Sequence, residues 1–111
     1  MAPEFEAHPE DDDLLRLSGE FDLAAMDEFL DVATAVADGR REVVLDLSNL
    51  DFMDSSGIRA ILKLAARVDE KGVVLLNPKQ NVRAVIRIAG VEGHLGIRVE
   101  PPEEDLPPNS E

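Results

Sequence analysis

The chain of 111 residues contains no cysteine, tryptophan or tyrosine, and its only aromatic residues are four phenylalanines. Without cysteine there can be no disulfide bond, thiolate metal ligand or thiol nucleophile. With so few rings there is little to stack on nucleobases or sugars, so the core must be built from aliphatic side chains. Apolar residues make up 44% of the chain, which is enough for one compact domain.

Two further absences concern membranes and export. No uninterrupted apolar run approaches the roughly 20 residues that a membrane-spanning helix needs. The first residues, Met-Ala-Pro-Glu-Phe-Glu, are acidic and lack the basic and apolar stretches of a secretory signal. We therefore expect a cytoplasmic protein without membrane insertion.

Basic residues are missing from both ends of the chain. Residues 1–13 hold six acidic residues and residues 100–111 hold five, with no Lys or Arg in either segment. Acidic ends repel phosphate backbones, so direct binding to nucleic acid is not expected. The ends either keep the protein in solution or dock on a basic partner. We divide the chain into an acidic N-terminal segment (1–13), a folded domain (14–99) and a proline-rich acidic tail (100–111).

Short apolar runs alternate with amphipathic segments along the domain. Strands are expected at 14–19, 42–47, 73–76 and 94–99, with a turn or loose loop at 8–13 and a connection at 48–54. Apolar residues recur at helical spacing over 26–37, 58–68 and 82–89, each followed by a glycine, and Asp22 is placed to cap the first helix. The residues expected to face inward on the second and third helices are Ile58, Ile61, Leu62, Ala65 and Val68, and Val82, Val85, Ile86 and Ala89. This order predicts one α/β domain: a mostly parallel sheet with crossover helices and an antiparallel strand near the N-terminus. The prolines of the tail predict disorder there.

The stretch Leu-Asp-Leu-Ser-Asn-Leu-Asp-Phe-Met-Asp-Ser-Ser-Gly-Ile (45–58) leads from a buried strand into a helix. Ligands and partners usually meet an open α/β sheet at this edge. Ser55 and Ser56 stand at the start of the helix, where free amides and the helix dipole favour an anion. A phosphate there would add about −1.5 to −2 charges to the outer surface without disturbing the fold. Asp and Ser are also ordinary helix caps, so a purely structural role stays open.

The same stretch closely resembles the signature of the STAS domain, the family of bacterial anti-sigma factor antagonists. Gly-Glu-Phe-Asp (19–22) is similar to an earlier segment of that family, and Gly90 with Val91 matches the glycine after the third helix. The resemblance covers residues 14–99 and implies a STAS-like fold. Two features depart from the family: the acidic tail stands in place of a further helix, and Arg59 occupies a position where small or apolar residues are common.

The resemblance implies a partner-switching cycle that regulates sigma-factor-dependent transcription in a stress response. The unmodified protein binds an anti-sigma factor, which is a serine kinase with an ATPase fold. That kinase phosphorylates Ser55, with Ser56 as the alternative acceptor, and the complex separates until a PP2C-type phosphatase removes the phosphate. The protein is then a substrate and not an enzyme. The implied partner-binding residues are Asp22, Asp54, Ser55, Ser56, Gly57 and Arg59.

Basic residues follow helical spacing on two of the expected helices. One stripe consists of Arg59, Lys63, Arg67 and Lys71, and the other of Lys79, Arg83 and Arg87. These are either solvated helix faces or a basic track that leads from the phosphorylation site and docks an acidic surface.

No catalytic residue, metal site or cofactor is expected. His8 and His94 lie far apart in sequence and have no neighbours at ligand spacing. Asp46, Asp51 and Asp54 do not have the spacing of a carboxylate site, and no glycine-rich phosphate loop is present. The alternative to a phosphorylated antagonist is a STAS-type adaptor subunit of a transporter or stress-signalling complex, which would keep the docking loop and lack the switch.

Overall fold

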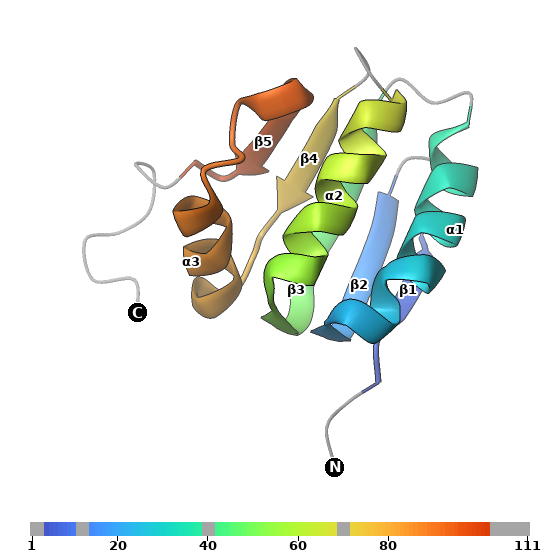
Figure 1. The fold of residues 1–111 in the computed structure, drawn as a ribbon, viewed down its shortest axis with the longest axis horizontal. Helices are drawn as coiled ribbons and strands as arrows, with labels where there is room; N and C mark the ends of the chain where they lie inside the picture. The colour runs from blue at the N-terminus through green and yellow to red at the C-terminus, as the bar shows by residue number, and fades with distance from the viewer. Residues whose placement is uncertain (1–3, 11–13, 39–41, 69–71, 103–111) are drawn as a thin grey trace.

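The computed structural model describes residues 4–10, 14–38, 42–68 and 72–102 (Figure 1). One five-stranded sheet has the order β1-β2-β3-β4-β5, with β1 antiparallel to β2 and all other neighbours parallel. The strands are β1 (Glu6–Pro9), β2 (Leu14–Phe21), β3 (Val43–Met53), β4 (Val73–Leu76) and β5 (Ile97–Glu100). The helices are α1 (Met26–Ala37), α2 (Ser55–Val68) and α3 (Gln80–Ala89), with 3₁₀ turns η1 (Leu23–Ala25) and η3 (His94–Gly96). The predicted α/β class and the antiparallel N-terminal strand are confirmed.

All three helices lie on one side of the sheet (Figure 1). This follows from the topology, because each crossover moves one strand further in the same direction and parallel crossovers are right-handed. Along β2 the burial alternates, with Leu15, Leu17 and Phe21 fully buried and the residues between them half-buried. The sheet is therefore packed against helices on one face and lies open on the other.

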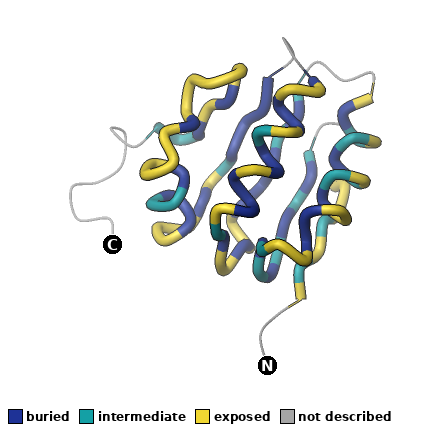
Figure 2. Tube along the Cα trace, viewed as in Figure 1, coloured by how far each residue is buried: buried dark blue, intermediate teal, exposed yellow. Residues whose placement is uncertain are grey.

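The core lies between the helices and this covered face, where Figure 2 shows the buried segments facing each other. The largest fully buried side chains are Leu15, Leu17, Phe21, Phe29, Leu45, Leu47, Leu50, Met53, Ile61, Leu64, Leu75 and Ile86. The ring of Phe21 lies 4.9 Å from that of Phe29 and 4.9 Å from that of Phe5, measured between centroids. Three of the four phenylalanines thus form one aromatic cluster at the end of β2 and the first turn of α1.

The N-terminal segment is more ordered than its composition suggested. Residues 6–9 pair with residues 15–18 as β1, so His8 and Pro9 are in a strand and not in the expected turn or loop. The segment packs tightly: a Cβ built on Gly19 would lie 2.1 Å from the carbonyl oxygen of Glu4. The rest of the predicted loop (11–13), the predicted helix stop at Gly39 and the tail from 103 lie outside the described residues.

Strand β3 extends six residues beyond the predicted end at Leu47, through the segment expected to be a connection. Its register with β2 shifts twice, between the pairs Arg16–Asp46 and Ser18–Asn49 and again between Gly19–Leu50 and Glu20–Phe52, each time with one extra residue on β3. Such bulges interrupt the period-2 burial pattern by which a strand is recognised. The carboxylate of Asp46 supports the first bulge by accepting from the Ser48 amide at 3.0 Å and the Ser48 hydroxyl at 2.7 Å.

Several smaller expectations are corrected. Leu64 on α2, absent from the predicted apolar series, is fully buried, whereas Leu62 is only partly buried. On α3 the predicted inward residue Ala89 is exposed, because α3 ends there at Gly90 in a left-handed conformation. The last strand begins at Ile97 because residues 94–96 form the turn η3.

Replacing Gly19 by alanine should destabilise the fold more than the same change at Gly90. Both residues have positive φ, +85° and +69°, but a Cβ at Gly90 meets nothing within 4 Å. We expect Gly90→Ala to lower the free energy of unfolding by about 1 kcal/mol through backbone strain. Gly19→Ala should lower it by roughly 2–4 kcal/mol, because displacement of the Glu4 backbone is added. Urea unfolding measures both; equal losses would contradict the close approach.

Candidate functional site

The junction between β3 and α2 is organised by Asp54. Its backbone amide donates to the carbonyl oxygen of Phe21 at 3.3 Å, which ties the end of β3 to the end of β2. Its side-chain Oδ1 accepts from the Ser56 amide at 2.8 Å, and its carbonyl accepts from the amide of Gly57 at 3.0 Å. Asp54 is therefore the N-cap of α2.

These bonds correct one part of the sequence argument. We expected free backbone amides around the serines, but the amides of Asp54, Ser56 and Gly57 are already bonded. A helix start leaves four backbone amides without a partner inside the helix, here those of residues 54 to 57. Of these four, only the Ser55 amide lacks a hydrogen-bond acceptor among the described residues. The helix dipole still favours an anion here, but few amides remain to bind one directly.

The two candidate serines differ sharply in exposure. Ser55 is the first residue of α2 and is exposed, whereas Ser56 is only 8% exposed. This difference follows from helix geometry, since Ser56 lies on the inward face with Gly57 and Ala60. Of the two serines, Ser55 is therefore the more accessible to another protein.

The paired ends of β2 and β3 bring Asp22 and Asp54 together. Phe21 and Met53 are partners in the sheet, so the two aspartates follow paired residues on adjacent strands. Asp22 Oδ1 accepts from the Ala24 amide at 3.1 Å and caps the 3₁₀ turn η1. We expected Asp22 to cap the first helix, but the N-cap of α1 is Ala25, which makes no side-chain capping bond. The two acidic residues expected beside the phosphorylation site are thus at the same edge of the sheet as Ser55.

Gly57 lies in the interior of the protein and not on the expected partner-binding surface. It is buried, and a Cβ built on it would lie 2.4 Å from Met53 Cγ and 3.2 Å from Phe21 Cγ. The space left by its missing side chain is inside the fold and is filled by these two residues. We expected Gly57 among the partner-binding residues, but in the structure it is buried where α2 packs against the ends of β2 and β3.

Two exposed apolar side chains near this edge were not singled out from the sequence. Leu23 in η1 is 68% exposed and Phe52, one residue before the end of β3, is 43% exposed. Their exposure depends on the 3₁₀ turn and on the second bulge, neither of which the apolar pattern signals. They offer hydrophobic contact area beside Asp22, Asp54 and Ser55.

The first turn of α3 is fixed to the same edge. Lys79 Nζ lies 2.5 Å from Asp51 Oδ1, and Asn81 Nδ2 donates to the Asp51 carbonyl oxygen at 2.8 Å. Lys79 therefore has an acidic partner, whereas the sequence placed it on a stripe of helix-surface cations. The second predicted stripe is also interrupted at Arg83, which is buried.

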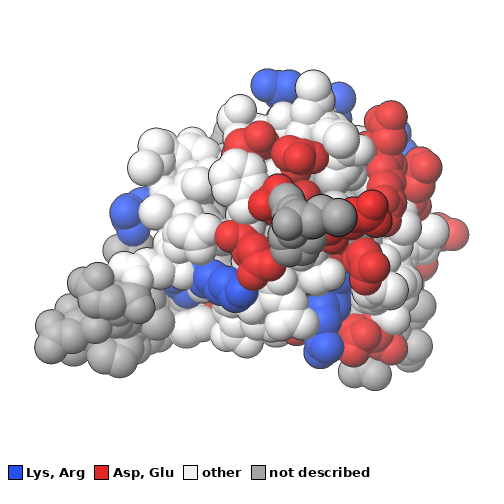
Figure 3. All heavy atoms as spheres, turned by 90° about the horizontal axis from the view of Figure 1, so that it is seen from below, with Lys and Arg blue, Asp and Glu red and all other residues white. Residues whose placement is uncertain are grey.

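Acidic side chains dominate this end of the molecule. Figure 3 looks onto the end where β2 and β3 finish and α2 begins, and Asp and Glu gather there around a few basic groups. Glu20, Asp22, Asp51 and Asp54 all belong to the ends of these two strands or follow them directly.

Arg59 is exposed one turn along α2 from Ser55, and Lys63 and Arg67 follow at the same spacing. None of these three cations forms an ion pair with a described residue. Lys71, the last member of this predicted stripe, lies outside the described residues.

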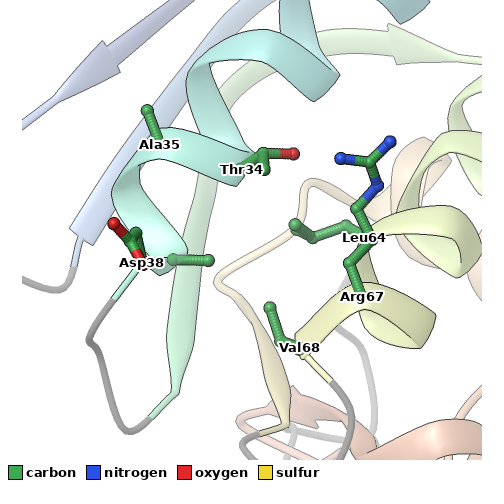
Figure 4. A pocket seen from close by; sticks show the side chains of 7 residues that line it. Thr34, Ala35, Asp38, Leu64, Arg67 and Val68 are labelled. Carbon is green, nitrogen blue, oxygen red and sulfur yellow. The ribbon is translucent and has the colours of Figure 1, made fainter.

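A shallow cleft of about 360 Å³ lies between α1 and α2 at their other ends, lined by Thr34, Ala35, Ala37, Asp38, Leu64, Arg67 and Val68. Figure 4 shows the side chains of Thr34 and Arg67 pointing toward one another across it. Since α2 begins at Ser55 and the cleft is lined by its last residues, the cleft contains none of the predicted site residues.

The carboxylates considered for a metal site serve separate purposes. Asp46 supports a bulge, Asp51 pairs with Lys79 and Asp54 caps α2. His8 pairs with Glu6 on β1, far along the chain from His94 in η3. Within the described ranges no three His, Asp or Glu side chains are grouped as metal ligands. None of the described helices combines the length and apolar character needed to cross a membrane.

The cap at Asp54 can be tested by comparing two substitutions. Asp54→Ala removes the acceptor of the Ser56 amide and should lower the free energy of unfolding by about 1 kcal/mol. Asp54→Asn keeps an acceptor oxygen and loses only the charge, so it should cost about 0.5 kcal/mol or less. Thermal and urea unfolding measure the difference; equal losses in the two variants would mean that the hydrogen bond contributes nothing.

Comparisons with known proteins agree on one family. A family model described as "Mlab, STAS domain" matches residues 5–99. A protein of Bordetella bronchiseptica named as an anti-sigma factor antagonist, BtrV, is 40% identical over 62 residues, which are 54% of this chain and 53% of that protein. The match thus spans about half the length of this relative.

Solved structures share the fold at lower identity. The anti-sigma factor antagonist SpoIIAA in its unphosphorylated form matches with a TM-score of 0.67 and 21% identity, over 91% of each chain. The phosphorylated form of SpoIIAA from Bacillus matches with a TM-score of 0.60 and 20% identity, over 91% of this chain and 95% of that one. Because the family model covers nearly all of the sheet and helices described above, this chain belongs to the STAS domain family.

Proposed function

We propose that this protein is an anti-sigma factor antagonist that binds an anti-sigma factor while Ser55 is unmodified and is released when Ser55 is phosphorylated. The observation that carries this proposal is the exposure of the Ser55 hydroxyl at the first residue of α2, beside a buried Ser56. A kinase must reach the hydroxyl it modifies, so Ser55 is the favoured acceptor. In the transfer, the γ-phosphoryl group of ATP passes to Ser55 Oγ, the hydroxyl loses its proton and ADP leaves.

The partner we propose is a serine kinase with an ATPase fold that also acts as the anti-sigma factor, opposed by a PP2C-type phosphatase. The name of the Bordetella relative supports the antagonist role, and the existence of SpoIIAA in phosphorylated and unphosphorylated forms supports the switch. Such a cycle places the protein in the cytoplasm, with an indirect effect on transcription and no contact with nucleic acid of its own.

The surroundings of Ser55 suit a contact that phosphate can break. Leu23 and Phe52 provide apolar area, and Asp22 and Asp54 provide hydrogen-bond acceptors beside the serine. A partner packed on this surface would exclude water from it, and an added dianion would then be buried against acidic neighbours. Loss of about 3 kcal/mol, or roughly a hundred-fold in affinity, is expected for such a change.

The acceptor can be identified with two alanine variants. Incubation with the cognate anti-sigma kinase and ATP should place one phosphate on wild-type protein and on Ser56→Ala, and none on Ser55→Ala, as read by phosphopeptide mass spectrometry. Ser55→Glu should weaken binding to the same kinase by about a hundred-fold with an unchanged circular dichroism spectrum. Full binding by Ser55→Glu, or absence of phosphate on residue 55, would favour the adaptor without a switch.

The apolar part of the docking surface can be tested separately from the phosphate. Leu23→Ala and Phe52→Ala should each weaken binding to the anti-sigma factor by roughly ten-fold or more, because each removes contact area from the interface centre. Ile88→Ala is the matched control, since Ile88 is 82% exposed on α3 and lies far along the chain from the proposed surface. Calorimetric titration measures the three affinities. An equal effect of Ile88→Ala would place the contact elsewhere.

A further inference from the structure

We infer that Arg59 is the internal counter-charge of phosphorylated Ser55, so that the modification adds an anion to the docking surface and withdraws a cation from it. The inference rests on the proposed phosphorylation of Ser55. It concerns a residue that the STAS resemblance marks as unusual, because small or apolar side chains are common at that position.

The helix places the two side chains within reach of each other. Residues four apart on a helix are neighbours on its surface, with Cβ atoms about 6 Å apart. Ser55 and Arg59 are both exposed, whereas the intervening Ser56, Gly57 and Ile58 are buried. Helical side chains lean toward the N-terminus, so the long side chain of Arg59 extends back toward the turn that begins with Ser55.

Arg59 has no anionic partner among the residues that the structure describes. It forms no ion pair within the described part of the chain, although Arg16, Lys79 and Arg98 each pair with carboxylates. The sequence of α2, Ser-Ser-Gly-Ile-Arg-Ala-Ile-Leu-Lys-Leu-Ala-Ala-Arg-Val, contains no acidic residue. The charged neighbour of Arg59 at i+4 is Lys63, and like charges at this spacing repel. A dianion at Ser55 would offset that repulsion by placing a negative charge beside the first of the three cations on this stripe.

The phosphate, in turn, has few other partners at this place. The amides of Asp54, Ser56 and Gly57 are occupied, and the nearest strand ends carry the carboxylates of Asp22 and Asp54. A guanidinium group can donate two parallel hydrogen bonds to a phosphate. Arg59 therefore supplies the charge that the backbone cannot.

The pairing changes what a partner meets. In the unmodified protein Arg59 pairs with no described carboxylate, and its guanidinium group is available to a carboxylate or carbonyl of the anti-sigma factor. In the phosphorylated protein the same guanidinium is held against Ser55. Release then has two causes, the bulk and charge of the phosphate and the loss of one cationic contact.

The pair can be measured without any kinase, by incorporating phosphoserine at residue 55 during translation and titrating it by ³¹P NMR. The second pKa of phosphoserine is about 6, and a nearby cation lowers it by favouring the dianion. We expect the pKa of this phosphate to rise by about 0.5 unit in Arg59→Gln. The carboxylates of Asp22 and Asp54 are the same in every variant, so the difference isolates Arg59.

Arg67→Gln is the matched control: it removes the same charge from the same stripe, at a residue about 18 Å from Ser55 along the helix axis. At an ionic strength near 0.1 M this separation exceeds the screening length of about 10 Å, so the phosphate pKa should stay within about 0.1 unit of the wild-type value. Equal pKa values in wild type and Arg59→Gln, or equal shifts in both variants, would overturn the inference.

A second readout comes from the arginine itself. The ¹⁵N–¹H signal of the Arg59 Nε group should move downfield when residue 55 carries phosphate, and the Arg67 signal should not. An unmoved Arg59 signal would also overturn the pairing. If Arg59→Gln fails to fold, the pairing is tested by Arg59→Lys and by the Arg59 Nε signal. The lysine variant should keep part of the lowering of the phosphate pKa, because it keeps the positive charge. Failure of a kinase to modify Ser55 would count against the proposed function and leave these measurements valid.

Discussion

Asp54 joins three elements that must meet for the site to exist. Its amide binds the end of β2, its position ends β3 and its carboxylate starts α2. The absence of a side chain at Gly57 lets the first turn of the helix settle on Met53 and Phe21. Without this junction the position of the Ser55 side chain would not be fixed, and Asp22 and Asp54 would not lie at the same end of the sheet.

Much of this architecture follows from local sequence patterns. Compact apolar runs such as Val73–Leu76 became strands, and the amphipathic series through Ile61 and Val68 became a helix that begins at Ser55. Short connections between these elements leave little choice but parallel crossovers, which put every helix on the same side. The start of α2 after a buried strand could therefore be predicted from local patterns, whereas the place of Asp22 beside it was implied by the STAS resemblance.

Other features depend on tertiary geometry that no local pattern encodes. The two bulges in β3 carry the strand beyond its predicted end and expose Phe52, although the residue is apolar. Likewise Arg83 is buried in spite of its charge, and Lys79 finds Asp51 from a different element. The occupied amides at the start of α2 depend on hydrogen-bond partners that are set only once β2 and β3 are aligned. If Ser55 is phosphorylated as we propose, these occupied amides leave a side chain, and not the backbone, to balance the phosphate.

The aromatic cluster has a practical consequence for handling this protein. Phe5 lies on Phe21, and Phe21 also supports the place where α2 begins. A fragment cut just before β2 would remove the Phe5 ring and uncover the Phe21 ring, which lies close to Gly57 in the first turn of α2. Tags and fusion partners should accordingly be attached upstream of Glu4, with β1 retained in full. Otherwise, weak binding by a shortened fragment could reflect lost core packing and not a change at Ser55.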